Sequence, residues 1–150
     1  MNEVIVNSKM KLSEHFKLGE LCKTSHKTAD GNIPSHVVIE NLKRLCPWLE
    51  ELRRRYNEPI IINSGYRSPA VNKLAGGSNT SNHLTGCAVD IRTYGMEQAM
   101  RYAVILMDYA DDSNLDFDEI LIEKNSKGSI WLHFAVRPKD NRRKIEFLKA

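Results

Sequence analysis

The residues best suited to do chemistry are a histidine and an aspartate, His83 and Asp90, within the segment Ser-Asn-His-Leu-Thr-Gly-Cys-Ala-Val-Asp at positions 81–90. A histidine in a loop and an aspartate on the following strand can bind one cation, and Gly86 lets the chain turn between them. His133 would supply a third ligand. Imidazole and carboxylate suit zinc, and three protein ligands leave a fourth position for water, as in catalytic sites. The alternative is that these side chains only satisfy hydrogen bonds.

Alternation along three later segments predicts that the polar candidates share one face of a sheet. Successive side chains of a strand point to opposite faces. In each segment two or three apolar residues occupy one set of alternate positions, and Asp90, Glu123 or His133 falls in the other set, together with a few apolar residues. If the apolar sets pack on helices, these three side chains lie together on the opposite face.

The rest of the pattern predicts the elements that position this face. Apolar residues recur in steps of three and four from Val38 to Tyr56, which is typical of an amphipathic helix. Ser35 is expected to cap this helix, and Pro47 to kink it, because the apolar stripe continues in phase. Further helices are expected at residues 69–75 and 96–109, and strands at 59–64, 86–93, 117–123 and 130–136. This order predicts an α+β fold, with N-terminal helices packed on a small, mainly antiparallel sheet.

Composition limits the class of protein. The chain has 150 residues, 41% of them hydrophobic and 27% charged, and a net charge of +3, as in one globular domain. We expect a single domain over residues 1–150, with a core at 11–137 and a basic C-terminal tail at 138–150. The basic cluster around Arg142 is interpreted as a solvated surface. The alternative is attraction to an anionic polymer such as a bacterial wall or a nucleic acid, although no aromatic residues interleave with these charges.

The sequence shows neither a recognisable targeting signal nor a cysteine motif. No apolar run is long enough for a membrane helix, and the N-terminus lacks the features of a secretory signal. We therefore expect the protein to be made in the cytoplasm. The three cysteines form no Cys-x-x-Cys pair and are interpreted as reduced thiols.

Three motifs follow one another along the chain: Ser-Gly-Tyr-Arg at 64–67, Ser-x-His-x-x-Gly-x-Ala-x-Asp at 81–90, and Trp-x-His at 131–133. In this order they resemble the zinc D-alanyl-D-alanine carboxypeptidase family, which shares a fold with the hedgehog signalling domain and cuts peptidoglycan stem peptides. The opening at 11–22 is similar to the smaller phage- and prophage-associated branch. The resemblance covers roughly residues 12–137.

The resemblance implies a hedgehog/DD-peptidase-like fold, with Zn²⁺ bound by His83, Asp90 and His133. It also implies that Arg67 orients the substrate and stabilises negative charge on the scissile carbonyl oxygen, a role that suits a planar, permanently charged guanidinium. The alternative for Arg67 is a structural arginine that holds its loop.

Three further residues are expected at the substrate. Ser81 matches a family serine near the substrate, and Tyr66 is expected to help shape the pocket. The alternative for these hydroxyls is that they cap turns. Trp131 shares the face of His133, so it is expected either to wall the cleft or to lie in the core.

The implied reaction is metal-dependent hydrolysis of a peptidoglycan peptide by activated water. Either a D,D-carboxypeptidase or an L-Ala/D-Glu-type endopeptidase fits the resemblance. We expect a monomer with no nucleic-acid partner and no membrane span, which reaches the bacterial cell wall after release or export.

One departure from the family pattern concerns the catalytic base. Several members carry a carboxylate three residues before the last histidine, where this chain has Ile130. Hydrolysis needs a group that takes a proton from water and gives it to the leaving amine. Glu123 is our candidate, and an exposed strand-end glutamate is the alternative. Asp118 and Glu119 are poorer candidates because they lie farther along the strand. The competing function is a non-catalytic, zinc-containing wall-binding or phage structural module.

Overall fold

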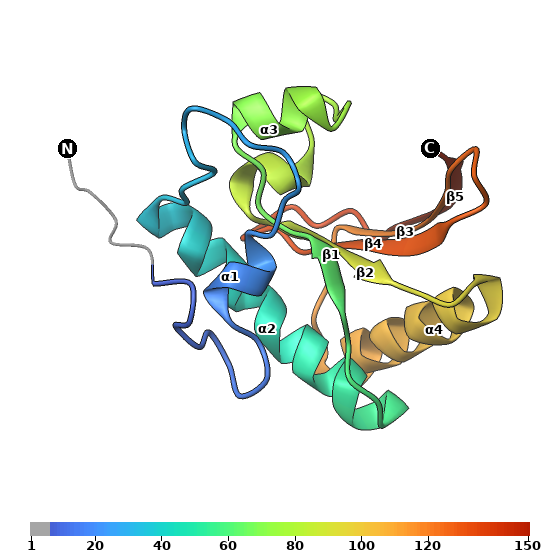
Figure 1. The fold of residues 1–150 in the computed structure, drawn as a ribbon. Coiled ribbons are helices and arrows are strands. Elements are labelled where there is room, and N and C mark those ends of the chain that lie inside the picture. Colours follow the sequence, from blue (N-terminus) through green and yellow to red (C-terminus); the bar gives the residue numbers. More distant parts are fainter. Residues whose placement is uncertain (1–6) are drawn as a thin grey trace.

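The computed structural model describes residues 7–150, and Figure 1 shows the arrangement of their helices and strands. The helices are α1 (Leu18–Leu21), α2 (His36–Tyr56), α3 (Pro69–Leu74) and α4 (Met96–Ser113), with a 3₁₀ turn η1 at Asn82–Thr85. The strands are β1 (Ile62–Ser64), β2 (Ala88–Arg92), β3 (Glu119–Lys124), β4 (Ile130–Ala135) and β5 (Lys144–Lys149). Residues 1–6, on which the expected lack of a secretory signal partly rests, lie outside the described residues.

The five strands form one mixed sheet in the order β1-β2-β4-β3-β5. Strands β1 to β4 pair antiparallel, and β5 runs parallel to β3. The register places Asp90 beside His133, and Leu121 beside the same histidine on its other side. The predicted α+β fold with a mainly antiparallel sheet is therefore confirmed, and the two predicted strand ligands are direct neighbours.

Helices α2 and α4 cover one face of the sheet, while α3 lies on the other side (Figure 1). The apolar alternation of the strands points toward these two helices, as predicted, with Ile91, Ile120, Leu132 and Phe134 all fully buried. The ring of Trp48 on α2 lies 5.3 Å from that of Phe134, centroid to centroid. Each such buried side chain stabilises the fold by about 1.5–3 kcal/mol. The opposite face of the sheet is left for polar residues.

Helix α2 begins where the sequence predicts. The Ser35 side chain accepts a hydrogen bond from the backbone N–H of Val38 at 3.2 Å, which satisfies one of the unpaired donors of the first turn. The helix continues through Pro47 as one element and ends at Asn57, whose left-handed φ of 62° closes the last turn.

The segment expected to be a basic tail contains a strand instead. Residues 144–149 form β5 and pair along the whole length of β3. The run Lys-Ile-Glu-Phe-Leu-Lys has strand-like alternation, which the neighbouring basic residues obscured. Most side chains of β5 remain exposed.

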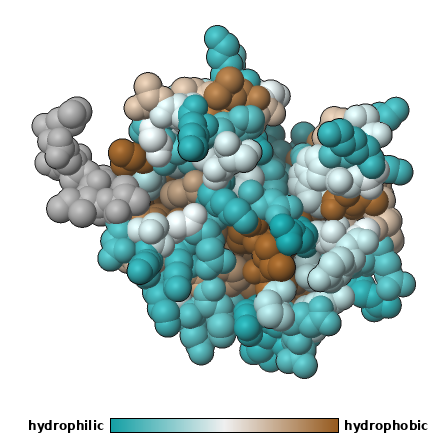
Figure 2. Space-filling view, viewed as in Figure 1, coloured by the Kyte–Doolittle hydropathy of each residue, from teal (hydrophilic) through white to brown (hydrophobic). Residues whose placement is uncertain are grey.

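The described surface is mostly polar. The face shown in Figure 2 is largely hydrophilic, with apolar side chains gathered near its centre. Among residues 7–150, no helix is both long and apolar enough to cross a membrane.

Candidate metal centre

The turn η1 presents His83 to the sheet. The hydroxyl of Ser81 accepts a hydrogen bond from the backbone N–H of His83 at 3.1 Å and so caps the turn. Gly86 ends it with a φ of 73°, and a Cβ atom there would lie 2.8 Å from a methyl group of Val38. Glycine is therefore required at this position both by the backbone conformation and by the close approach of α2.

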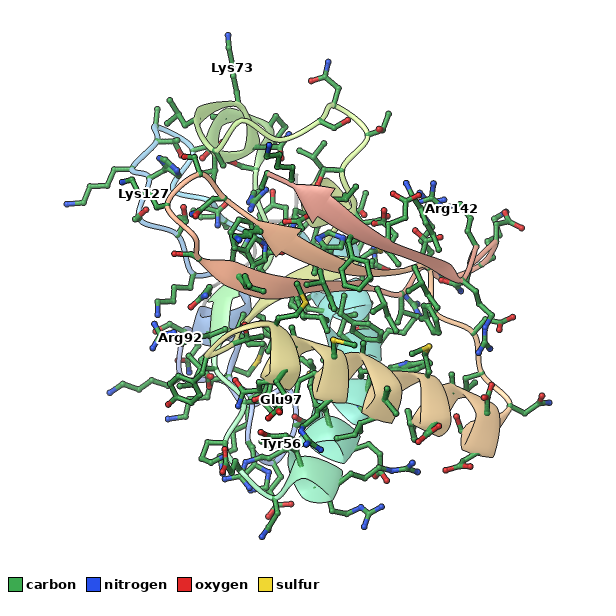
Figure 3. All side chains as sticks on the ribbon, turned by 90° about the vertical axis from the view of Figure 1, so that its right-hand side faces the viewer. Tyr56, Lys73, Arg92, Glu97, Lys127 and Arg142 are labelled. Carbon is green, nitrogen blue, oxygen red and sulfur yellow. The ribbon has the colours of Figure 1, made fainter. Side chains whose placement is uncertain are left out.

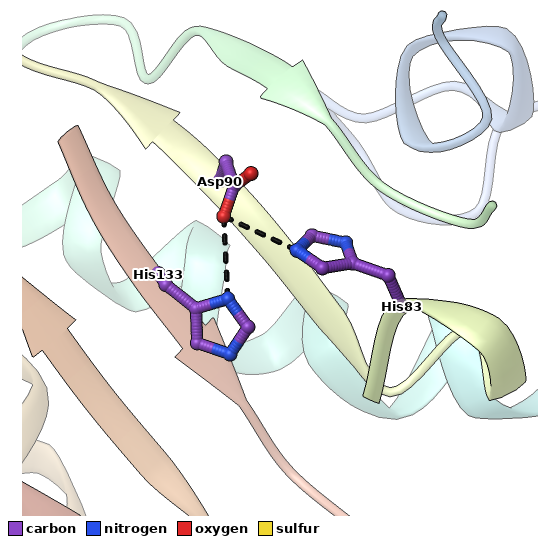
Figure 4. Close-up of side chains that lie close together, drawn as sticks. All are labelled: His83, Asp90 and His133. Atoms are coloured by element: carbon purple, nitrogen blue, oxygen red, sulfur yellow. Dashed lines mark hydrogen bonds and ion pairs between the residues drawn. The ribbon is translucent and has the colours of Figure 1, made fainter. Parts of the chain in front are cut away.

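The three predicted ligands converge on one point, as Figure 4 shows. The Nε2 atom of His83 and the Nδ1 atom of His133 lie 3.2 and 3.3 Å from the same oxygen, Oδ1 of Asp90. One ligand atom from each residue lies within 4.8 Å of the other two, and all three residues are buried. Two imidazole nitrogens and one carboxylate oxygen form the donor set of a catalytic zinc site, so the residues fit that ion.

The remaining nitrogen of each imidazole has a partner of its own. His83 Nδ1 lies 2.7 Å from the carbonyl oxygen of Gly65, and His133 Nε2 lies 3.0 Å from Oε1 of Glu119. A carbonyl or carboxylate oxygen accepts the hydrogen bond, so these nitrogens carry protons. Such partners fix the tautomer and ring orientation of metal-binding histidines. His83 Nε2 and His133 Nδ1 are left facing the common point.

The electrostatics of the three residues follow from their burial and from the charges around them. Burial raises the pKa of Asp90, but the two histidines lower it by more, so the pKa lies well below its usual range. Burial lowers the pKa of His133, but its hydrogen bonds to Asp90 and Glu119 raise it by more, to about 9. The site therefore attracts positive charge to a buried location, as a cation-binding centre must.

Arg67 lies beside the same carboxylate. Its Nη2 atom is 3.2 Å from Oδ2 of Asp90, and its Nε donates to the Ser64 hydroxyl at 3.2 Å. Its backbone N–H donates to the carbonyl oxygen of His83 at 2.9 Å. The Ser-Gly-Tyr-Arg loop and the turn η1 are thus joined by a backbone hydrogen bond, which helps to position the guanidinium at the edge of the centre.

The three residues lie in the wall of a cavity of about 580 Å³. Four other residues predicted at the site line the same cavity: Arg67, Ser81, Glu123 and Trp131. Tyr66 does not line it. Its side chain packs in the hydrophobic core, and its backbone N–H donates to the carbonyl oxygen of Leu21 at 2.7 Å. The structure brings together the predicted site residues except this one.

Glu123 and Ile130 lie on opposite faces of the sheet. Glu123 lines the cavity and pairs with Trp131 across β3 and β4. Burial raises the pKa of Glu123, and the negative charge of Asp90 raises it further. Ile130 packs against the hydrophobic core, on the face opposite His133. Ile130 therefore neither carries an ionisable group nor faces the metal centre.

Sequence reasoning missed a polar network behind the histidines. Asp118 is fully buried and accepts hydrogen bonds from Asn82 and Arg142. Figure 3 shows that Arg142 lies at one end of the strands, far from Lys127 at the other end, so the network is at the Arg142 end. The position of Glu119 on the predicted site face was a signal for part of this network. Arg142 gave none, because it reaches the site only through long-range folding.

Comparison with known proteins adds the family. The family model described as Peptidase M15 matches residues 14–112, which include Arg67, His83 and Asp90. Among solved structures, the L-Ala D-Glu endopeptidase ChiX of Serratia marcescens is 26% identical, with a TM-score of 0.41. That match covers 68% of this chain and 87% of the other. No curated protein matches. Because the family model covers well over half of this chain, the chain belongs to the peptidase M15 family.

Proposed function

We propose that this protein is a zinc-dependent peptidase that hydrolyses a peptide bond in peptidoglycan stem peptides. The observation that carries the proposal is the convergence of His83, Asp90 and His133 at the wall of a cavity, with the outer nitrogen of each imidazole already hydrogen-bonded. Bound zinc supplies Lewis acidity, which activates water and polarises a carbonyl. Membership of the peptidase M15 family supports the same class of reaction.

Arg67 is proposed to bind the oxygen of the scissile carbonyl as negative charge develops on it. Its Nη2 contacts Asp90, and its guanidinium lines the cavity, so it can reach a substrate without leaving its support. A fixed cation aimed at a developing oxyanion lowers the barrier because it needs no reorganisation during the reaction. A lysine would lack the planar donor pair that holds both partners at once.

Glu123 is proposed as the general base and acid. It lines the cavity on the site face, and its raised pKa lies closer to neutrality than that of an exposed glutamate. Such a carboxyl group accepts a proton from water and returns it to the leaving amine more effectively. Ser81 and Trp131 are proposed to contact the substrate from the cavity wall.

The scissile bond is proposed to be either the terminal D-Ala–D-Ala bond or an L-Ala/D-Glu-type bond. The charged and amide groups of a stem peptide suit a polar cavity lined by side chains of both charges. We propose that the protein acts on the bacterial cell wall as a monomer, after release or export.

The test is digestion of purified peptidoglycan by the zinc-loaded protein, with products identified by mass spectrometry. Release of D-alanine or of a cleaved stem peptide is expected, and it should disappear in His83→Ala. Glu123→Gln should bind zinc like the wild type and lose at least about 100-fold in turnover. Unchanged turnover in this variant would exclude Glu123 as the base. Bound zinc without any product would favour a non-catalytic wall-binding module.

A further inference from the structure

The carboxylate of Glu119 lies against the outer edge of a proposed metal ligand. Its Oε1 atom is 3.0 Å from Nε2 of His133, the nitrogen opposite the one that faces Asp90. Glu119 therefore contacts the imidazole on the side away from the metal position. It is placed to orient the ligand, and it cannot serve as a base for water on the other side of the ring.

Glu119 is itself held from two directions. The side-chain amide of Asn82 donates to the same Oε1 at 2.7 Å, and Nη2 of Arg142 lies 3.4 Å from Oε2. Asn82 immediately precedes His83, so its side chain connects the turn that carries one histidine to the carboxylate that holds the other. The side chain of Glu119 is only 12% exposed, and its contacts are therefore weakly screened by solvent.

A second carboxylate, that of Asp118, holds two arginines beside this network. Asp118, fully buried, receives Nε and Nη2 of Arg142 at 3.0 and 2.8 Å, and Nε of Arg137 lies 3.2 Å from it. Two adjacent carboxylates would repel each other in a buried location, and the two guanidiniums offset that repulsion. Arg142 lies in the segment that leads into β5. It contacts Glu119, which in turn contacts His133.

We propose that Glu119 is a positioning residue of the metal centre, and that Arg142 and Asn82 fix it in place. This inference rests on the proposed zinc-dependent function. The carboxylate holds the proton of His133 on Nε2, fixes the orientation of the ring and makes Nδ1 a more basic ligand. Residues that do not themselves bind the metal, Glu119, Asn82 and Arg142, would therefore influence the zinc affinity.

The competing explanation is that Glu119 only completes a buried ion pair that stabilises the sheet. The two explanations differ in what they predict for the folded protein. A structural role changes the free energy of unfolding and leaves the bound metal unaltered. A positioning role changes zinc affinity and the ligand field in a protein that is still folded.

The experiment measures zinc dissociation constants by competition with a chromophoric chelator, and visible spectra of the cobalt-substituted protein. Glu119→Ala should weaken zinc binding about 10- to 100-fold and alter the cobalt spectrum. Glu119→Gln keeps an acceptor for Nε2 and should lose less. Arg142→Ala should loosen Glu119 and weaken binding several-fold. The matched control is Glu146→Gln, an exposed carboxylate on β5 beside Leu121.

Each outcome decides the inference. Folded Glu119→Ala and Arg142→Ala proteins that bind zinc within twofold of the wild type, with unchanged cobalt spectra, would overturn it while leaving the proposed function intact. If Glu119→Ala does not fold, Arg142→Ala carries the test. A wild-type protein that binds no zinc would overturn the proposed function and the positioning role together.

Discussion

The Nδ1 atom of His83 donates a hydrogen bond to the carbonyl oxygen of Gly65, 2.7 Å away. This contact joins the Ser-Gly-Tyr-Arg motif to the metal centre through its backbone, not through a side chain. Gly65 also passes very close to α1, where a Cβ atom would lie 2.0 Å from the carbonyl oxygen of Leu21. The glycine of the motif is therefore fixed by packing, and its carbonyl is fixed with it.

Gly65→Ala should damage both stability and metal binding. The added methyl group meets backbone, which cannot move aside like a flexible side chain, so the loop must shift away from α1. We expect a loss of about 1–3 kcal/mol in the free energy of unfolding. Zinc affinity should fall as well, because the acceptor of His83 moves with the loop. Chemical denaturation and chelator competition measure the two effects.

Gly76→Ala is the matched control for this loop substitution. Gly76 has a φ of 75°, but an added methyl group would meet no atom within 4 Å, so only backbone strain of about 1–2 kcal/mol is expected. The zinc affinity of this variant should equal that of the wild type. Equal zinc affinity in Gly65→Ala would show that the carbonyl contact does not support His83.

Removal of a ligand should abolish metal-dependent stabilisation. A ligand that binds only the native state stabilises it by about 4 kcal/mol at 1,000 times its dissociation constant. His83→Ala should therefore remove most of the rise in melting temperature that zinc gives the wild type. His36→Ala, an exposed histidine at the start of α2, should keep that rise. A full zinc-induced rise in His83→Ala would exclude this residue as a ligand.

The acid limb of activity, measured with zinc in saturating excess at every pH, should report Glu123. Burial raises the pKa of this carboxyl group, and a general base acts only when deprotonated. Activity should therefore be lost, as the pH falls, at a higher pH than the ordinary glutamate value of about 4.3. The pH dependence of kcat/KM measures this limb in the free enzyme. A limb at or below the ordinary value would argue against Glu123.

Much of the fold was predictable because its signals are local. The apolar stripe of α2, the cap at Ser35 and the alternation around Asp90 and His133 depend on periodicity, which is encoded within a few residues. Strand β5 was missed because Arg142 and its basic neighbours dominate the composition there, whereas its pairing with β3 is a long-range property.

The site residues that stand in sequence motifs could be predicted, and their hydrogen-bond partners outside the motifs could not. His83, Asp90, His133 and Arg67 stand in recognisable spacings, and the structure brings them together. Tyr66 stands in a motif as well, but its side chain belongs to the core. The partners behind the ligands carry no spacing signal. Glu119 and Asn82 are 37 residues apart, and only the folded sheet brings their side chains together.

Zinc binding should release a proton near neutral pH. The pKa of His133 in the metal-free protein is raised to about 9, since the hydrogen bonds to Asp90 and Glu119 outweigh the effect of burial. The imidazole is therefore protonated at pH 7, and it must be neutral at Nδ1 to bind metal. We expect release of roughly one proton from this residue, and an apparent zinc affinity that rises about tenfold per pH unit until about pH 9.

The same shift fixes the sign of the stability effect without metal. The folded pKa of His133 lies above the unfolded value of about 6.5, so its contribution is fully present below pH 6.5 and is lost as the pH rises through about 9. The metal-free protein should thus become less stable over this window while its zinc affinity increases. Titration calorimetry in buffers of different ionisation enthalpy counts the released protons, and denaturation with chelator present follows the stability. Zinc binding with no proton release at pH 7 would mean that His133 is neutral before the metal binds, and the pH-dependent loss of stability should then be absent too.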